Sequence, residues 1–176
     1  MVATTGKIKQ LREETGVSIM ECKRALEQAK GNIQKAKDLL KKKGLELAAK
    51  RSSRATMQGR IESYIHHNHK VGALVEINCE TDFVAKNEDF VKLCKDIAMH
   101  IVAARPLFFK KEDVSKEDVP EKEKPEDFYK RACLLEQSFI KDDKMTIGEY
   151  VSSLIAKTGE NIVIGRYTRF VLGESV

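Results

Sequence analysis

Four consecutive residues, Thr81, Asp82, Phe83 and Val84, combine a hydroxyl, a carboxylate and an aromatic ring. They stand between an expected strand and an expected helix, where a loop is the natural connection. A phenylalanine in a short polar loop either covers the core as a lid or fills a pocket on a partner protein. The aspartate beside it can accept a hydrogen bond or repel another anion. The residue types favour neither interpretation, so both stay open at this point.

A second candidate contact lies at residues 16–20, which begin with a glycine. Ser18 precedes Glu21 by three residues, and this is the capping-box spacing of a helix N-terminus. Ile19 and Met20 then fall in the first turn of that helix, beside a glycine-containing loop. They either staple the helix start to the core or leave at least one side chain exposed for a partner.

Three histidines, His66, His67 and His69, cluster at the expected tip of a hairpin. Strand alternation sends His66 to the face opposite the other two, and a metal site would need a fourth ligand, so polar hairpin residues are favoured. No Ser-His-Asp or Cys-His arrangement, P-loop or G-x-G-x-x-G motif stands out. We therefore expect no enzyme activity, no metal, no cofactor and no small-molecule substrate.

Composition narrows the class of protein further. The chain has 176 residues, of which 41% are hydrophobic and 34% charged. This suits one domain, or a small module joined to a larger one. No apolar run is long enough to span a membrane, and the N-terminus lacks the apolar stretch of a secretory signal. The four cysteines form no C-x-x-C pair, so we expect buried, reduced thiols in a cytoplasmic protein.

Positive charge concentrates in residues 35–60, although the net charge of the whole chain is only +5. A basic helix of this kind can follow a phosphate backbone. This stretch has no aromatic residue for stacking on bases, and leucine and alanine are interleaved with its charges. A solvated connecting helix is therefore favoured, and we expect no nucleic-acid partner.

Residues 1–44 are expected to form a bundle of three short helices. The first covers about residues 5–14, and the second follows the Ser18 cap. The third is capped by Asn32 and ends at Gly44 in the C′ position. Such a module resembles a ubiquitin-associated domain, and a bundle this small usually exists to bind another protein. Residues 45–59 are expected to form a connecting helix.

Residues 60–176 are expected to form an α+β core domain responsible for dimerisation. Alternation of apolar and other residues predicts strands over residues 61–65, 71–77 and 161–172. The first two are close enough in sequence to form a hairpin. The predicted architecture is a small antiparallel sheet of about three strands packed against helices.

Two helices complete this core in the prediction. Asn87 caps the first, whose apolar stripe ends before Pro106. Thr146 and Glu149 form the capping box of the second. Residues 110–136 lie between these helices and hold many charges and few apolar side chains. We expect them to form a solvated connection.

The last strand is apolar on both faces, and this bears on assembly. Strict alternation divides its apolar residues into two sets: Ile162, Ile164, Phe170 and Leu172 on one face, and Val163, Tyr167 and Val171 on the other. One set can pack on the chain's own helices, but the other then needs cover. A two-fold partner would supply it, so we expect a homodimer. The alternative is a monomer in which residues 110–136 cover that face.

Four segments of the chain resemble the elongation factor Ts family. Residues 10–26, QLREETGVSIMECKRAL, are similar to its N-terminal signature, and residues 78–87, NCETDFVAKN, to its more specific second signature. Residues 137–143 and 159–162 resemble two further segments, and the four occur in the family's order. The resemblance implies a translation factor that binds elongation factor Tu with GDP and promotes GDP release, so that GTP can bind.

The resemblance also implies which residues contact elongation factor Tu. Residues 81–84, with Asp82 and Phe83 at their centre, correspond to the segment that enters the GTPase domain and disturbs its magnesium site. A second grip on that domain is implied for four residues of the N-terminal module: Val17, Ile19, Met20 and Lys23. The expected homodimer would then form a two-plus-two complex with elongation factor Tu.

The chain departs from long members of the family. They carry two copies of the core and a long helical hairpin, whereas this chain has one copy and too few residues at 110–136 for a full hairpin. Ser138 stands where proline is expected, and Gly165-Arg166 where two arginines are expected. The chain thus resembles the short form of the family. A helical-bundle adaptor and a basic nucleic-acid-binding protein are the alternative functions.

Overall fold

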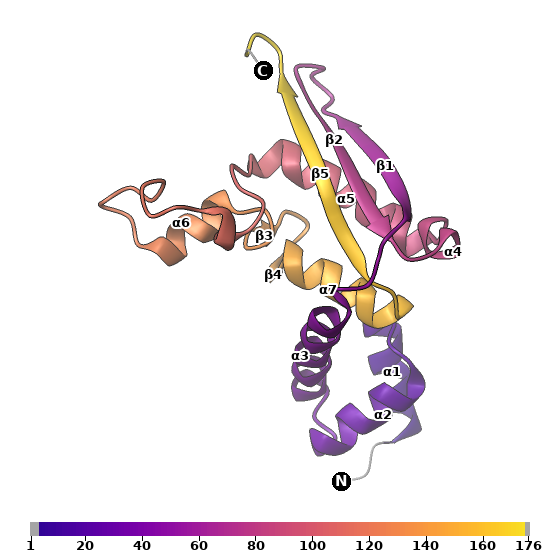
Figure 1. Ribbon diagram of the computed structural model, residues 1–176. Coiled ribbons are helices and arrows are strands. Elements are labelled where there is room, and N and C mark those ends of the chain that lie inside the picture. Colours follow the sequence, from indigo (N-terminus) through magenta and orange to yellow (C-terminus); the bar gives the residue numbers. More distant parts are fainter. Residues whose placement is uncertain (1–3, 175–176) are drawn as a thin grey trace. The chain divides into compact units, whose positions relative to one another are not determined.

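The computed structural model describes residues 4–174, which fold into two compact units. The first unit contains the residues up to Arg54 together with Ser152–Asn161. The second contains Ala55–Val151 and the residues from Ile162 onward. Helices and a small antiparallel sheet occupy different parts of the chain (Figure 1), which confirms the predicted α+β class.

Three helices make up most of the first unit: α1 (Thr5–Thr15), α2 (Ile19–Gln28) and α3 (Ile33–Arg51). The Ser18 hydroxyl accepts a hydrogen bond from the Glu21 amide at 3.3 Å. The Asn32 side chain accepts one from the Lys35 amide at 3.0 Å. Both predicted helix caps are therefore confirmed, but the Glu21 carboxylate accepts from Arg24 and Lys43 and does not complete the predicted capping box. The apolar sides of the helices meet in one core: Leu11, Cys22, Ala25, Leu26, Ala29, Ala36 and Leu40.

Helix α3 does not end at Gly44, as the sequence suggested, but continues to Arg51. The connecting helix predicted over residues 45–59 is therefore wrong, because its first part belongs to α3 and β1 already begins at Gln58. Gly44 is buried inside the helix, where an added Cβ would lie 3.5 Å from the carbonyl oxygen of Ser152 and 3.6 Å from the Ala156 side chain. The missing side chain therefore allows two helical segments of the first unit to pack closely. A glycine that permits close packing and a glycine that ends a helix look alike in a sequence.

The second unit is built on a three-stranded antiparallel sheet in the order β1-β2-β5. The strands are β1 (Gln58–Ile65), β2 (Val71–Cys79) and β5 (Ile162–Val171). Helix α5 (Glu88–Ala104) packs across β1 and β2 on one face of the sheet (Figure 1). The β1–β2 hairpin that the sequence predicted is confirmed, and its turn holds His69 in the left-handed region at φ 57°.

The other face of the sheet is exposed and carries five large apolar side chains beside four polar residues, Ser63, Glu76, Arg166 and Thr168. We call it the open sheet face and define it by five residues: Ile61, Ile65, Leu74, Phe170 and Leu172. In the strand register Ile65 and Phe170 both pair with Gly72, one from each side. Paired residues of neighbouring strands point to the same face, so these side chains share one surface. Residues 110–136 of the same chain do not bury them.

The predicted division of β5 into two faces is wrong beyond Ile164. Ile162 and Ile164 are each only 3% exposed, whereas Phe170 is 53% and Leu172 76% exposed. The register explains the difference, because Ile164 pairs with Ile77 but Arg166 pairs with the adjacent Glu76. Gly165 is thus an extra residue, a β-bulge, and it reverses the alternation of every residue after it.

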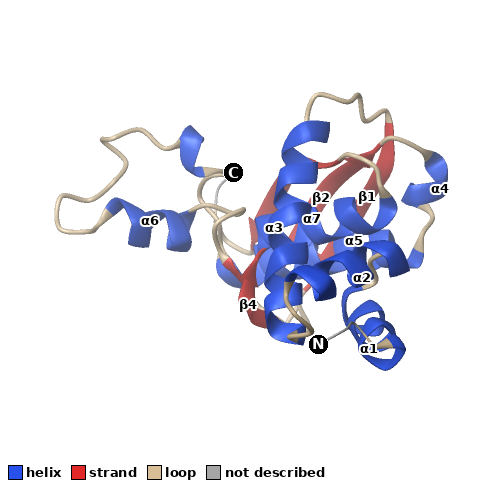
Figure 2. Ribbon diagram, turned by 90° about the horizontal axis from the view of Figure 1, so that it is seen from below, coloured by secondary structure: helices blue, strands red, loops and turns tan. Residues whose placement is uncertain are grey.

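The segment that joins α5 to β5 combines loops with short helices and strands (Figure 2). It contains a short 3-10 turn, η1 (Lys111–Asp113), helix α6 (Pro125–Ala132), strands β3 (Ser138–Phe139) and β4 (Asp142–Thr146), and helix α7 (Ile147–Thr158). The sequence predicted a solvated connection here and did not anticipate α6. That helix has proline in its first turn and a buried aromatic anchor, Phe128, which is 3% exposed.

A buried amide joins three parts of the second unit. Gln137 is 4% exposed. Its Nε2 donates to the carbonyl oxygens of Ala104 at 3.3 Å and Arg131 at 2.7 Å, which lie at the ends of α5 and α6. Its Oε1 lies 2.9 Å from Nε2 of His100. Since the amide nitrogen already donates twice, Oε1 is the acceptor, and the neutral His100 ring carries its proton on Nε2.

Stability should fall as the pH drops below about 6.5, and His100 should contribute to the fall. Burial lowers the pKa of His100, and its buried Nδ1 has no hydrogen-bond partner within the described residues. Below its ordinary pKa the unfolded chain therefore takes up a proton that the folded chain does not. One such proton changes the free energy of unfolding by at most about 1.4 kcal/mol per pH unit.

Urea midpoints at pH 7.5 and pH 5.5 measure this effect. The drop between them should be smaller in His100→Gln than in the wild type. The exposed His67 supplies the matched variant His67→Gln, which should keep the wild-type drop. An equal drop in all three proteins would remove His100 as a source of the acid sensitivity.

Candidate partner-binding site

The segment that follows β2 forms one turn of helix, α4 (Asp82–Ala85), and not the loop that the sequence suggested. The Thr81 hydroxyl accepts a hydrogen bond from the Val84 amide at 3.4 Å and so caps the turn. The Cys79 thiol donates to the Thr81 carbonyl at 3.1 Å, so the last residue of β2 holds the start of the turn. The start of α4 is thus anchored to the end of β2.

The far end of this turn is fixed as well. The Lys86 and Asn87 amides donate to the Asp82 and Val84 carbonyls at 3.1 and 3.0 Å. The Asn87 side chain then accepts from the Asp89 amide at 2.9 Å, which confirms the predicted cap of α5. Hydrogen bonds at both ends of α4 therefore connect β2 to α5.

Phe83 projects from this turn into solvent. Its side chain is 83% exposed, and no residue of α4 is buried. Of the two interpretations that the sequence left open, the core lid is therefore excluded. A large exposed aromatic side chain on a well-anchored turn is the arrangement that protein–protein contacts use.

Asp82 lies beside this ring and is paired within the turn. Its Oδ2 accepts from Nζ of Lys86 at 2.8 Å. This hydrogen bond, together with the positive charge of Lys86, holds the pKa of Asp82 below its ordinary value. The carboxylate is thus ionised at neutral pH and remains half-exposed, so that a partner can reach it.

The first unit carries the other predicted contact, at the start of α2. Gly16 has a left-handed φ of 67° and ends α1, and its amide donates to the Arg12 carbonyl at 2.8 Å. Val17 packs against the helical core, whereas Ile19 is 51% and Met20 56% exposed. Val17 therefore fills the role of a staple, and the two residues after Ser18 remain available for contact.

Lys23 lies one turn further along α2 and is exposed, 4.0 Å from Glu27. The predicted contact residues thus fall into two groups, one in each unit. Val17, Ile19, Met20 and Lys23 share one corner of the first unit. Residues 81–84 share one turn in the second.

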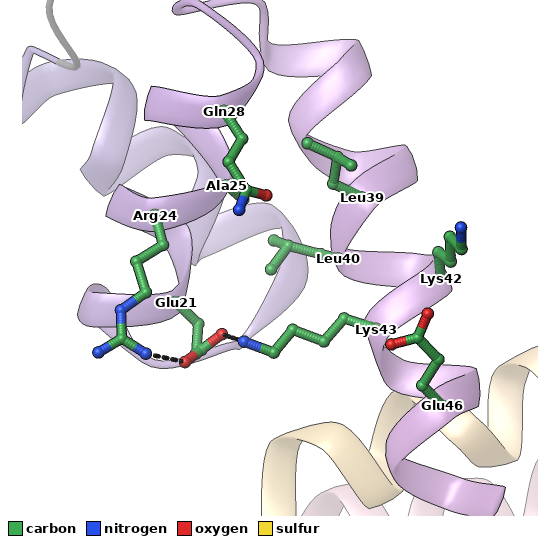
Figure 3. A pocket seen from close by; sticks show the side chains of 9 residues that line it. All are labelled: Glu21, Arg24, Ala25, Gln28, Leu39, Leu40, Lys42, Lys43 and Glu46. Atoms are coloured by element: carbon green, nitrogen blue, oxygen red, sulfur yellow. Dashed lines mark hydrogen bonds and ion pairs between the residues drawn. The ribbon is translucent and has the colours of Figure 1, made fainter.

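A groove between α2 and α3 was not anticipated from the sequence. It has a volume of about 340 Å³ and is lined by nine residues: Glu21, Arg24, Ala25, Gln28, Leu39, Leu40, Lys42, Lys43 and Glu46. Figure 3 shows Arg24 and Lys43 reaching the Glu21 carboxylate from the two helices. The bond from Lys43 is the main cause that lowers the pKa of Glu21. The lining residues come from two helices, so the groove could be recognised only once the packing of α2 against α3 was known.

Other kinds of site find less support in the described residues. Tyr64 Oη lies 3.3 Å from Nδ1 of His66 at the hairpin, but no group of three His, Cys, Asp or Glu side chains among residues 4–174 could hold a metal ion. Within the same residues, no helix has both the length and the hydrophobicity of a membrane span. All four cysteines are buried, as predicted, and burial raises the pKa of Cys94 to about 12.

Comparison with known proteins identifies similar chains. The family model described as elongation factor TS matches residues 3–126. Elongation factor Ts of Solibacter usitatus is 47% identical over 196 aligned positions, which cover 98% of this chain and 92% of the relative. The protein of the same name from Caldanaerobacter subterraneus is 45% identical, covering 96% of each chain. The 196 positions exceed the 176 residues of this chain, so the Solibacter usitatus relative has residues that this chain lacks.

Proposed function

The chain belongs to the elongation factor Ts family of translation elongation factors, and on that premise we propose that it is the guanine-nucleotide exchange factor of elongation factor Tu. It binds elongation factor Tu loaded with GDP and promotes the release of GDP, after which GTP binds. The observation that carries this proposal is Phe83, an exposed aromatic ring on a capped and anchored turn. In this role the chain makes and breaks no covalent bond.

The proposed mechanism acts on the magnesium ion in the partner's GTPase domain. This ion bridges phosphate oxygens of the nucleotide and is held by few protein ligands. Phe83 and Asp82 enter next to the elements that support the ion and displace them. Loss of the cation removes a large favourable charge interaction with the phosphates, so the affinity for GDP falls. The factor need not touch the nucleotide.

The exchange cycle closes by thermodynamic linkage. If the factor weakens GDP binding by some ratio, GDP weakens binding of the factor by the same ratio. The same reciprocity applies to GTP, which therefore displaces the factor when it binds. Asp82 and Phe83, which we call the wedge, act in this proposal only on the conformation of the partner. Such an action satisfies the reciprocity and needs no energy source.

The corner at Val17, Ile19, Met20 and Lys23 supplies the second grip in this proposal. Ile19 and Met20 are exposed apolar side chains, and Lys23 adds a positive charge at the edge. In this proposal the contact acts apart from the magnesium site, and its effect is to hold the complex together. We therefore assign affinity to the first unit and the exchange step to residues 81–84.

Release of a fluorescent GDP analogue from elongation factor Tu tests the proposal directly. Addition of the chain with excess unlabelled GDP should speed the loss of fluorescence in a saturable manner. An unchanged release rate at micromolar concentrations of the chain would reject the exchange function. The concentration series yields two parameters, the maximum rate and the concentration for half-maximal effect.

The double variant Ile19→Ser/Met20→Ser should raise the half-maximal concentration about ten-fold and leave the maximum rate unchanged. Loss of exposed apolar contact area weakens binding, while the wedge is untouched. Leu45→Ser is the matched control, because Leu45 is 42% exposed in the same unit but belongs to α3 and not to the four residues of this corner. Wild-type concentration dependence in the double variant would remove the second grip.

Assembly is the last part of the proposal. We propose that two copies pair through the open sheet face and that the dimer binds two molecules of elongation factor Tu. The exposed apolar residues on this face support the pairing, since a single chain leaves them in water. A second copy would bury both faces at once by a two-fold rotation.

A further inference from the structure

Lys86 faces Asp82 across the single turn of α4. Its Nζ lies 2.8 Å from Oδ2 of Asp82, and the i,i+4 spacing places the two side chains on the same side of the turn. The Lys86 side chain is 77% exposed and that of Asp82 50%. Ion pairs this exposed contribute little to the stability of a fold. The pair lies immediately beside Phe83, so its role is better sought in the contact with the partner.

The hydrogen bonds at the two ends of the turn hold its backbone, whereas Lys86 holds a side chain. Cys79 and Thr81 hold backbone groups at the start of α4, and Asn87 caps the helix that follows. Lys86 instead reaches the end of the Asp82 side chain. A helix of four residues is far shorter than one that is stable by itself, so a side-chain link across its single turn restricts its motion.

We propose that Lys86 is a positioning residue of the exchange site: it holds the Asp82 carboxylate in the orientation with which Asp82 and Phe83 enter elongation factor Tu. This inference rests on the proposed exchange function. A carboxylate without its partner would sample several side-chain rotamers. Binding would then have to order it, and a group that is already ordered avoids that cost.

The consequence should appear in the maximum rate of GDP release. Contacts of the first unit set the concentration at which the complex forms, whereas residues 81–84 act within the complex. Lys86→Gln removes the charge and keeps most of the side-chain length. It should lower the maximum rate about three-fold, in line with the small coupling of exposed ion pairs. Lys86→Arg keeps the charge and should retain more than half of the wild-type rate.

Two further variants separate positioning from simple support of the turn. In Asp82→Lys/Lys86→Asp the ion pair is present in reverse, but the carboxylate has moved to the other end of α4. Asp82→Ala should release GDP more slowly than the wild type, and we expect the reversed pair to be equally slow. Wild-type exchange by the reversed pair would show that the pair only stabilises α4, and it would overturn the proposal.

A double-mutant cycle tests whether Lys86 acts through Asp82. Lys86→Gln should cause no further loss in the Asp82→Ala background, because the group that it positions is gone. A further three-fold loss would mean that Lys86 contacts the partner itself, which contradicts positioning. Failure of the wild-type chain to speed GDP release would reject the proposed function, whereas wild-type rates in both Asp82→Ala and Phe83→Ala would reject the role of residues 81–84 and with it that of Lys86. Slow exchange in those two with a normal rate in Lys86→Gln would reject only the role of Lys86.

Discussion

Replacing Phe83 by alanine should leave the chain folded and remove most of its exchange activity. An exposed surface side chain contributes little to folding, so the free energy of unfolding should change by no more than about 0.5 kcal/mol. Aromatic residues at the centre of an interface often contribute about 2 kcal/mol or more, which corresponds to a roughly 30-fold slower exchange step. Urea unfolding and the GDP-release assay on the same sample measure the two effects.

Phe90 provides the opposite control. It lies seven residues further along the chain, at the start of α5, and it is fully buried. Phe90→Ala should destabilise the second unit by about 3 to 5 kcal/mol, the usual cost of truncating a buried phenylalanine. If Phe83→Ala instead showed this large destabilisation and released GDP normally, the proposed role of Phe83 in exchange would be disproved.

The sequence predicted the elements near the site better than it predicted the site's own conformation. Ser18, Asn32 and Asn87 were identified as caps because capping depends on a few neighbouring residues, and the structure confirms all three. The turn at residues 82–85 is too short to show a helical period. A polar stretch with one aromatic residue therefore suggested a loop, and the exposure of Phe83 could be learned only from the structure.

Two glycines explain why the end of α3 and the faces of β5 differ from the prediction. Gly44 permits close helix packing, but its surroundings are residues more than a hundred positions away in the chain. Gly165 is the bulge that reverses the faces of β5, and strict alternation carried through this glycine assigns every later residue to the opposite face. In both cases the residues that the glycine contacts are distant in sequence. Patterns of neighbouring residues therefore do not predict the structural role of the glycine.

The observed register changes which residues form the exposed apolar surface on which the proposed dimer depends. Alternation alone grouped Phe170 and Leu172 with Ile164, which is buried. The bulge instead places them with Ile65 and Leu74 on the open sheet face. The apolar surface is therefore contributed by all three strands and not by β5 alone. A surface of this kind on a small sheet is a typical site of self-association.

Light scattering at micromolar concentration should give a mass near twice the 19.9 kDa of one chain. Leu74→Glu/Phe170→Glu should reduce it to the mass of one chain, because burying two carboxylates in a symmetric apolar interface costs more than the contact returns. Leu107→Glu is the matched control, since Leu107 is 66% exposed but lies outside the sheet, and this variant should remain a dimer. A wild-type mass near 19.9 kDa that does not rise with concentration, together with full exchange activity, would contradict the dimer and leave the open sheet face without this role.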